Sequence, residues 1–144
     1  MAITAGITTA FKQAILSGKH LSTHAYKIAL YPSSATIGPT TVTYSPTGEC
    51  PGTGNYTQGG TALSGFAVTL DGTTAILDFT SDPSWSSSTI TARGALIWNT
   101  DASFSGVTNT VCVLDFGSDI VSTNGTFTVT IPAATAAAGL VRIA

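Results

Sequence analysis

The chain of 144 residues carries a net charge of −2, and only 8% of its residues are charged. An ordinary soluble domain has about 25% charged residues, and threonine and serine take their place here. The five Lys and Arg residues are scattered, which excludes a surface built for the phosphate backbone of nucleic acid. We expect one domain over residues 1–144 and no membrane partner, because no apolar run reaches the roughly 18 residues of a membrane-spanning helix. A surface this poor in charge indicates that other subunits cover part of it.

One short amphipathic helix is predicted near the N-terminus, over residues 8–17. Thr8 can cap its start, and Gly18 suits the left-handed residue that follows a last helical turn. A helix of this length needs a sheet or a partner to cover its apolar face. The N-terminus lacks the basic region and the long apolar run of a signal peptide, so we expect folding in a cytoplasm. The apolar positions at helical spacing are Ile7, Phe11, Ala14 and Ile15.

The next element is a strand over residues 25–31, ended by Pro32. Tyr26, Ile28 and Leu30 alternate with Lys27 and Ala29, which predicts a second, wetter face. Residues 33–60 are rich in Ser, Thr, Gly and Pro and include one short candidate strand at 41–44. We expect this long segment to be an extended arm or loop that lies over a neighbouring subunit.

Further short strands are expected at residues 66–70, 75–79, 93–99, 110–116, 126–131 and 140–143. Asp71-Gly72 predicts a tight hairpin between the first two. A loop is expected at Pro83-Ser84-Trp85 and the serine run that follows. Residues 110–131 are predicted as an antiparallel pair joined by a long loop, and the alanine-rich link 133–139 as one helical turn or a crossover.

Strict alternation in the last part of this stretch predicts a core face, formed by Phe127, Val129 and Ile131 together with Leu114 and Phe116. Seven or eight short strands with frequent turn signals are typical of a β-sandwich. The predicted fold is therefore all-β, an antiparallel and jelly-roll-like sandwich with one short N-terminal α-helix.

The residues that could carry chemistry form no recognisable catalytic, cofactor-binding or metal-binding pattern. His20 and His24 are four residues apart, but they follow the helix stop and no glutamate joins them, so we interpret them as polar residues of a loop. Asp78, Asp82 and Asp115 are interpreted as ordinary turn or surface carboxylates. Two alternatives remain for the cysteines: Cys112 is a small buried hydrophobe, or it forms a disulfide with Cys50.

Large apolar side chains in or beside the predicted helix and loops are the candidate interface residues. Aromatic residues are enriched where one protein surface covers another. The alternative for the loop aromatics is that they anchor the loops on the domain's own core. The candidates are Phe11, Ile15, Tyr44, Tyr56, Trp85 and Phe104.

Four segments together resemble a group of small virion structural proteins of tailed bacteriophages. They read FKQAILSGKH, HAYKIALYPSSATIGPTTVTYSPTGE, ITARGALIWN and VCVLDFGSDIVSTNGTFTVTIPAATAAAGLVRIA, and they cover most of the chain. The resemblance implies a non-enzymatic virion component that is assembled in the bacterial host cytoplasm. Analogy with small β-rich proteins that clamp phage capsids favours a decoration or cement protein, which binds the major capsid protein and stabilises its shell.

Two other functions compete with this expectation. The first is a tail, spike or fibre-base component that contacts the host surface and binds glycan. The second is a small glycan-active enzyme, which the scattered acidic residues do not support. In the favoured case the partners are the major capsid protein or other virion proteins, and we expect the chain to act as a homo-oligomer or in direct contact with a shell.

Overall fold

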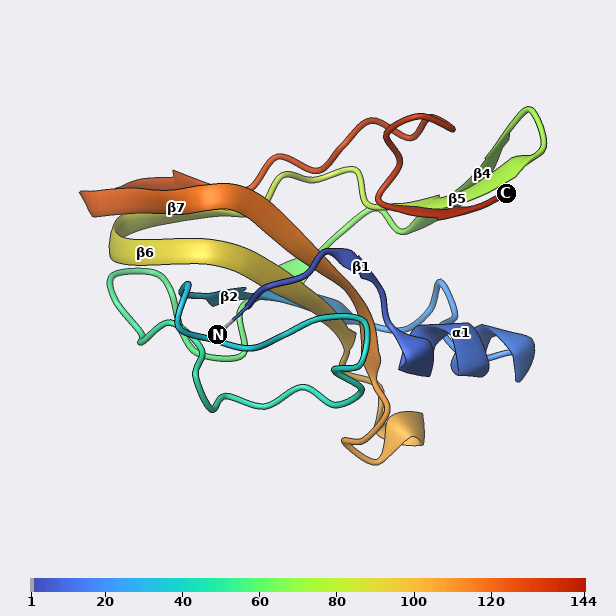
Figure 1. Ribbon diagram of the computed structural model, residues 1–144, viewed down its shortest axis with the longest axis horizontal. Helices are drawn as coiled ribbons and strands as arrows, with labels where there is room; N and C mark the ends of the chain where they lie inside the picture. Colours follow the sequence, from blue (N-terminus) through green and yellow to red (C-terminus); the bar gives the residue numbers. More distant parts are fainter. Residues whose placement is uncertain (1) are drawn as a thin grey trace.

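Two antiparallel sheets pack face to face as a sandwich in the computed structural model, which describes residues 2–144 (Figure 1). The strand order is β1-β7-β6-β2-β3 in one sheet and β4-β5-β8 in the other. The predicted antiparallel β-sandwich with one short N-terminal helix is therefore confirmed. The elements are β1 (Gly6–Ile7), α1 (Thr9–Leu16), β2 (Tyr26–Tyr31), β3 (Thr61–Leu63), β4 (Ala67–Asp71), β5 (Thr74–Asp78), β6 (Ser84–Asn99), the 3₁₀-helix η1 (Ala102–Phe104), β7 (Thr110–Thr128) and β8 (Val141–Ile143).

The helix begins and ends close to where the sequence predicts. The Thr8 hydroxyl caps α1 by accepting a hydrogen bond from the Phe11 amide, and it also donates to the carbonyl of Val111 in β7. Gly18 has a φ of 70°, as expected for the residue that follows a helix end. Phe11 is 2% exposed and joins the main core. The cap therefore fixes both the start of α1 and its attachment to the sheet.

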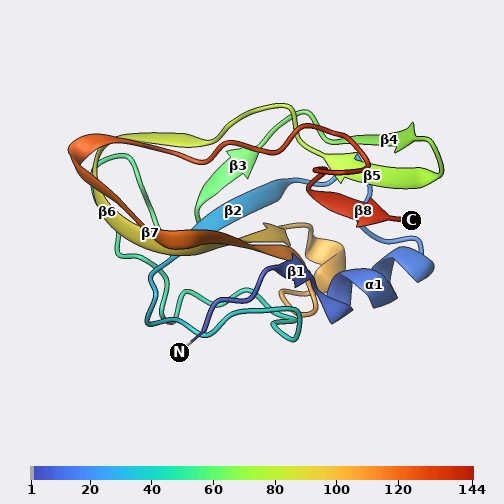
Figure 2. The ribbon, with the colours of Figure 1, turned by 45° about the horizontal axis from the view of Figure 1, so that its top comes forward.

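Strands β6 and β7 form one long antiparallel ribbon, whose register runs from Ser84 opposite Thr128 to Trp98 opposite Thr110. The prediction of two short strands joined by a long loop in residues 110–131 is wrong, because β7 runs on to Thr128 and pairs again with β6 at residues 120–122 and at Gly125. Gly117 and Asn124, with φ of 82° and 46°, form irregularities inside the strand and no loop. Register shifts let the ribbon bend, and Figure 2 shows its far end turning over toward the layer of β4 and β5.

The loop predicted for the serine run is also wrong, since β6 begins at Ser84. Trp85, Ile90 and Ala92 are buried, and the serines and threonines between them mostly face solvent. Buried Ser88 occupies one of the register shifts, where its hydroxyl donates to the carbonyls of Trp85 and Gly125. The apolar alternation of a half-buried strand is present, but bulges interrupt its period.

Residues 33–60 cover the chain's own five-stranded sheet, on the face opposite the second sheet (Figure 2). Ala35 and Ile37 from this segment pack with Ala29 and Tyr31 of β2 in a second core cluster. The predicted wetter face of β2 is therefore wrong, because Ala29 is 0% and Tyr31 is 2% exposed. The candidate strand at 41–44 is also wrong, since these residues form no strand.

The C-terminal part of the chain returns through a single turn. The amide of Gly139 donates to the carbonyl of Thr135 at 2.8 Å, which closes one helical turn within the alanine-rich link. The Arg142 guanidinium donates to the carbonyls of Ala136 and Ala137 and so secures this turn to β8. Both predicted alternatives for residues 133–139 describe part of what is observed, because the link contains this single turn and carries the chain from the five-stranded to the three-stranded sheet.

A glycine at position 60 permits the closest approach between the long segment and β2. Gly60 has a φ of 78°, and a Cβ there would lie 1.8 Å from the carbonyl oxygen of Ile28. We expect Gly60→Ala to lower the free energy of unfolding by roughly 2–4 kcal/mol, from backbone strain together with displacement of the segment. Urea denaturation followed by tryptophan fluorescence measures the change.

The matched control for this prediction is Gly72→Ala in the β4–β5 hairpin, which forms at Asp71-Gly72 as predicted. Gly72 has a similar φ of 61°, but a Cβ there would meet nothing within 4 Å. The free energy of unfolding of this variant should therefore fall by only about 1 kcal/mol, which is the cost of placing a residue with a Cβ in the left-handed conformation. Equal losses in the two variants would show that the contact with Ile28 does not matter.

Candidate interaction surfaces

Most of the predicted interface residues fill the core of this chain. Phe11, Tyr56, Trp85 and Phe104 are each at most 3% exposed, so the alternative of anchoring on the chain's own core describes their place in the fold. The remaining two, Ile15 and Tyr44, are only partly buried. Tyr44 stacks on Trp98 with ring centroids 4.1 Å apart, and Ile15 lines a groove between α1 and the smaller sheet.

A buried carboxylate that the sequence analysis did not single out fixes the long segment. Glu49 is 6% exposed and accepts hydrogen bonds from the hydroxyls of Tyr44 (2.6 Å) and Tyr56 (2.5 Å) and from the Gly59 amide (2.9 Å). Burial, followed by the bond to the Glu49 carboxylate, raises the pKa of both tyrosines, so each keeps its proton and donates it. The signal that could have found this site is that Glu49 is the chain's one glutamate.

The acidic side chains singled out in the sequence hold backbone amides. Asp82 accepts from the Ile131 amide at 2.7 Å, and Asp78 accepts from the Phe79 amide at 2.8 Å. Asp115 accepts from Gly117 and from Arg93, and the hydrogen bond with Arg93 holds the pKa of Asp115 below its ordinary value. The interpretation of Asp115 as a surface carboxylate bonded to a nearby amide is confirmed.

The two histidines lie in the loop between α1 and β2, as interpreted, but they are not a solvated pair. His20 is 6% exposed, and its ring packs between Phe11 and Phe104 at centroid distances of 4.9 and 4.7 Å. Asn99, at the end of β6, places its side-chain nitrogen 3.3 Å from Nδ1 of His20 and 3.0 Å from Nδ1 of His24. These contacts join three parts of the chain that are distant in sequence.

Both cysteines are free and buried, so the alternative of a Cys50–Cys112 disulfide is wrong. Burial raises the pKa of each thiol to about 12, and each therefore stays protonated at neutral pH. The Cys50 thiol donates to the carbonyl of Thr91 at 3.4 Å. Across residues 2–144, no three His, Cys, Asp or Glu side chains come together in a group that could hold a metal ion.

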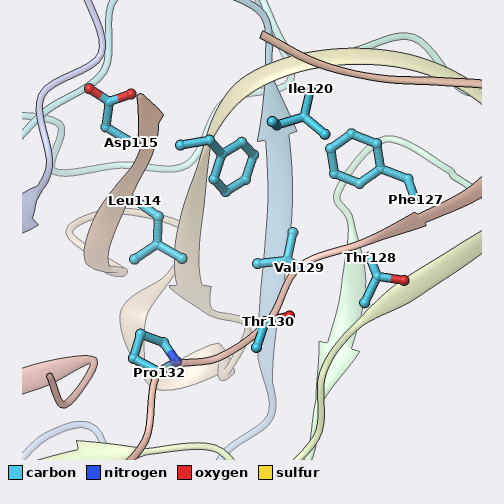
Figure 3. A pocket seen from close by; sticks show the side chains of 9 residues that line it. Leu114, Asp115, Ile120, Phe127, Thr128, Val129, Thr130 and Pro132 are labelled. Carbon is cyan, nitrogen blue, oxygen red and sulfur yellow. The ribbon is translucent and has the colours of Figure 1, made fainter. Parts of the chain in front are cut away.

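An apolar cleft of about 380 Å³ opens where β7 bends back on itself (Figure 3). Leu114, from the first part of β7, and Phe127, from its last part, face the same space, with Ile120 at the bend and Val129 just beyond the strand's end. The cleft's size falls within the roughly 300–1,000 Å³ of ligand pockets, and its wall is mostly apolar. Its lining residues are Leu114, Asp115, Phe116, Ile120, Phe127, Thr128, Val129, Thr130 and Pro132.

A second groove of about 570 Å³ continues from this cleft and shares Leu114 and Pro132 with it. It runs between β1 and the C-terminal residues 136–144. Beside both hollows the outer edge of β7 is open, because β1 pairs only with Cys112 and Val113, and no other strand in residues 2–144 covers that edge. The side of the sandwich that holds the cleft, the second groove and the uncovered edge of β7 is called the open side below. An apolar hollow beside an unpaired strand edge favours association with another chain.

Exposed apolar side chains also gather on the smaller sheet and at the end of α1. Val68 and Leu70 of β4 are 64% and 75% exposed, and Leu16 at the end of α1 is 90% exposed.

No helix within residues 2–144 has the length and apolar character needed to span a bilayer. Comparison with known proteins finds no matching family model, no matching curated protein and no matching solved structure.

Proposed function

We propose that this chain is a non-enzymatic structural protein of a tailed-bacteriophage virion, and that it decorates the capsid by binding the major capsid protein. The open side of the sandwich carries the proposal. There an apolar cleft lies beside an uncovered stretch of β7, residues 114–128, in a chain with only 8% charged residues. The resemblance of four long segments to small phage virion proteins supplies the biological setting.

The cleft has the features by which a shell protein could hold such a partner. An apolar loop or extended segment of the shell would place its side chains against Leu114 and Ile120, while its backbone pairs with the free edge of β7. A standard interface covers roughly 800 Å² per partner, about 12% of this chain's 6917 Å². An interface of that size would extend beyond the cleft and its neighbouring groove onto the surface around them.

The polar groups of the chain support a structural role in a second way. Glu49, Asp78, Asp82 and Asp115 all accept hydrogen bonds from backbone amides. The bonds of Glu49 and Asp82 hold together parts of the chain that are separate in sequence. Segments held in this way suit repeated, identical contacts on a symmetric shell, because little conformational entropy is lost on binding.

Binding to purified capsids tests the proposal. Ile120 is 42% exposed at the mouth of the cleft, and Ile120→Lys should weaken capsid binding by at least about tenfold, because it places a charge where apolar contact is needed. Val107→Lys is the matched control, since Val107 is 54% exposed but does not line the cleft. Wild-type binding should change little as salt is raised, because few ion pairs are available to screen.

The amount of the protein in particles separates the two virion roles. A decoration protein should occupy many symmetry-equivalent positions of the shell, and a tail, spike or fibre-base component should be present in few copies. Quantitative mass spectrometry of purified virions gives this ratio. A low copy number, or capsid binding that Ile120→Lys and Val107→Lys reduce equally, would contradict the proposal.

A further inference from the structure

We propose that His20 is an acid-sensitive latch, which holds α1 and η1 together in its neutral form and releases them when it gains a proton. The inference is independent of the proposed virion role. It concerns the end of the sandwich where α1 and η1 lie side by side (Figures 1 and 2).

The His20 ring is the common neighbour of three elements. Its centroid lies 4.9 Å from the ring of Phe11 in α1, 4.7 Å from that of Phe104 in η1 and 6.2 Å from that of Tyr26 in β2. Because His20 itself is 6% exposed, its ring forms part of the buried packing of α1, η1 and β2. Displacement of this one side chain would therefore remove the packing that α1 and η1 share.

The hydrogen bonds around Asn99 can form only while His20 and His24 are neutral. The side-chain oxygen of Asn99 accepts a hydrogen bond from the Asp101 amide at 2.9 Å, so its NH₂ group faces Nδ1 of both His20 and His24. Each Nδ1 must then act as an acceptor, and any proton on His20 sits on Nε2. A second proton on Nδ1 would point at the NH₂ group of Asn99, and rotation of the amide is blocked because its oxygen is in use.

Burial and the neighbouring cationic groups oppose protonation of His20, and they outweigh the nearby carboxylate of Asp101. Nε2 of His20 is buried without a hydrogen-bond partner. Lys19 lies over the Phe104 ring, 5.4 Å from its centroid, and the nearby carboxylate of Asp101 lies 3.7 Å from Nε2 of His24. The Tyr26 hydroxyl donates to the Leu21 carbonyl. Burial first, and then His24 and Lys19, lower the pKa of His20 to about 4.

The backbone of His20 adopts the left-handed region, with a φ of 65°. Histidine, like asparagine, occupies this region more readily than most side chains do. The packed ring and its contact with Asn99 fix the side chain on this backbone. Once protonation makes the buried position unfavourable, outward movement of the ring relieves the electrostatic conflict.

The expected consequence is local opening in acid. In the opened form His20 regains its ordinary pKa of 6.5, so this form binds the proton more tightly than the closed form. Opening therefore becomes more favourable as pH falls below 6.5, and the gain levels off only below pH 4, the pKa of the closed form. Two-state linkage gives a population of opened molecules roughly 50-fold larger at pH 4.5 than at pH 7. Opening would expose Phe11 and Phe104 beside Leu16, which is already exposed.

Amide hydrogen exchange on the full chain tests the latch. After correction for intrinsic rates, amides of α1 and η1 should lose protection by roughly 50-fold between pH 7 and pH 4.5, while amides of β6 and β7 keep theirs. His20→Asn should abolish this dependence, since asparagine tolerates the left-handed backbone and does not titrate. Lys12→Gln, on the exposed face of α1 and outside the contacts of Asn99, is the control and should retain this dependence.

Two results would overturn the inference. One is constant protection of α1 in the wild-type protein across this pH range, and the other is an equal acid response in wild type and His20→Asn. A direct NMR titration of the His20 ring in the unaltered chain decides the matter even if His20→Asn folds poorly. Protonation near pH 4, with the neutral ring carrying its proton on Nε2, supports the latch, and protonation near pH 6.5 contradicts it.

Discussion

Phe127→Ala is expected to lower the free energy of unfolding by roughly 3–5 kcal/mol, a large part of the 5–15 kcal/mol that a domain of this size has. Phe127 is 3% exposed, and its ring lies 6.1 Å from that of Trp85 and 6.3 Å from that of Phe116. Trp85 and Phe127 are paired across β6 and β7 at the far end of the ribbon. Truncation would leave a cavity between the bent ribbon and the rest of the core, and the rigid pairing of the strands would prevent its collapse.

Chemical denaturation of the variant measures this loss, and a neighbouring position supplies the control. Val121 lies on the same strand but is 62% exposed, so Val121→Ala should change the free energy of unfolding by no more than about 0.5 kcal/mol. If Phe127→Ala were as mild as Val121→Ala, the far end of the ribbon would not be part of the core, and the cleft of Figure 3 would not be a defined surface.

The elements that the sequence predicted well are those with an uninterrupted period. Phe127, Val129 and Ile131 alternate strictly and are all buried, as expected. Leu114 and Phe116, expected on the same core face, pack against the core but are only partly buried. Helix α1 was predictable because its apolar spacing, its cap and its glycine stop agree with one another.

The long ribbon was not predictable in the same way, because its middle is polar. Gly117 and Asn124 resemble loop residues and have no register partner on β6, yet pairing resumes after each of them, at Ile120 and at Gly125, so that β7 continues. In the same way, the serines in the first half of β6 resemble a loop although they lie in a strand. Whether such a stretch forms a strand depends on a partner strand that is distant in sequence. The composition of the stretch alone therefore does not predict the pairing.

The candidate surface was the least predictable part. Tyr56 and Trp85 were candidates for contact with a partner, but Trp85 lies in β6 and the ring of Tyr56 packs against it, so both are buried within the chain. The apolar cleft instead arises from core-type residues that the bend of β7 leaves uncovered. Its existence depends on where the ribbon turns, which follows from the register shifts and not from any local motif.

Glu49→Ala should lower the free energy of unfolding by roughly 3–5 kcal/mol, the range observed when one partner of a buried charged network is removed. The substitution leaves the hydroxyls of Tyr44 and Tyr56 and the Gly59 amide without their acceptor, and water reaches this site poorly because Glu49 is 6% exposed. Asp119→Ala is the control, since Asp119 is exposed and accepts one long hydrogen bond, from Ser33 at 3.4 Å. It should change the free energy of unfolding by about 0.5 kcal/mol or less.

A double-mutant cycle with Tyr56→Phe shows whether the carboxylate acts through its tyrosine partners. The Tyr56 hydroxyl donates to Glu49 and accepts from the Leu30 amide of β2, so it connects the long segment to the sheet. Loss of the hydroxyl removes one of the donors that Glu49→Ala would strand, and the two losses should therefore be less than additive by about 1 kcal/mol or more. Strict additivity would mean that Glu49 stabilises the segment through Gly59 and Tyr44 alone. If Glu49→Ala left the free energy of unfolding unchanged, the hydrogen bonds of Glu49 would not be what holds residues 33–60 on the sheet.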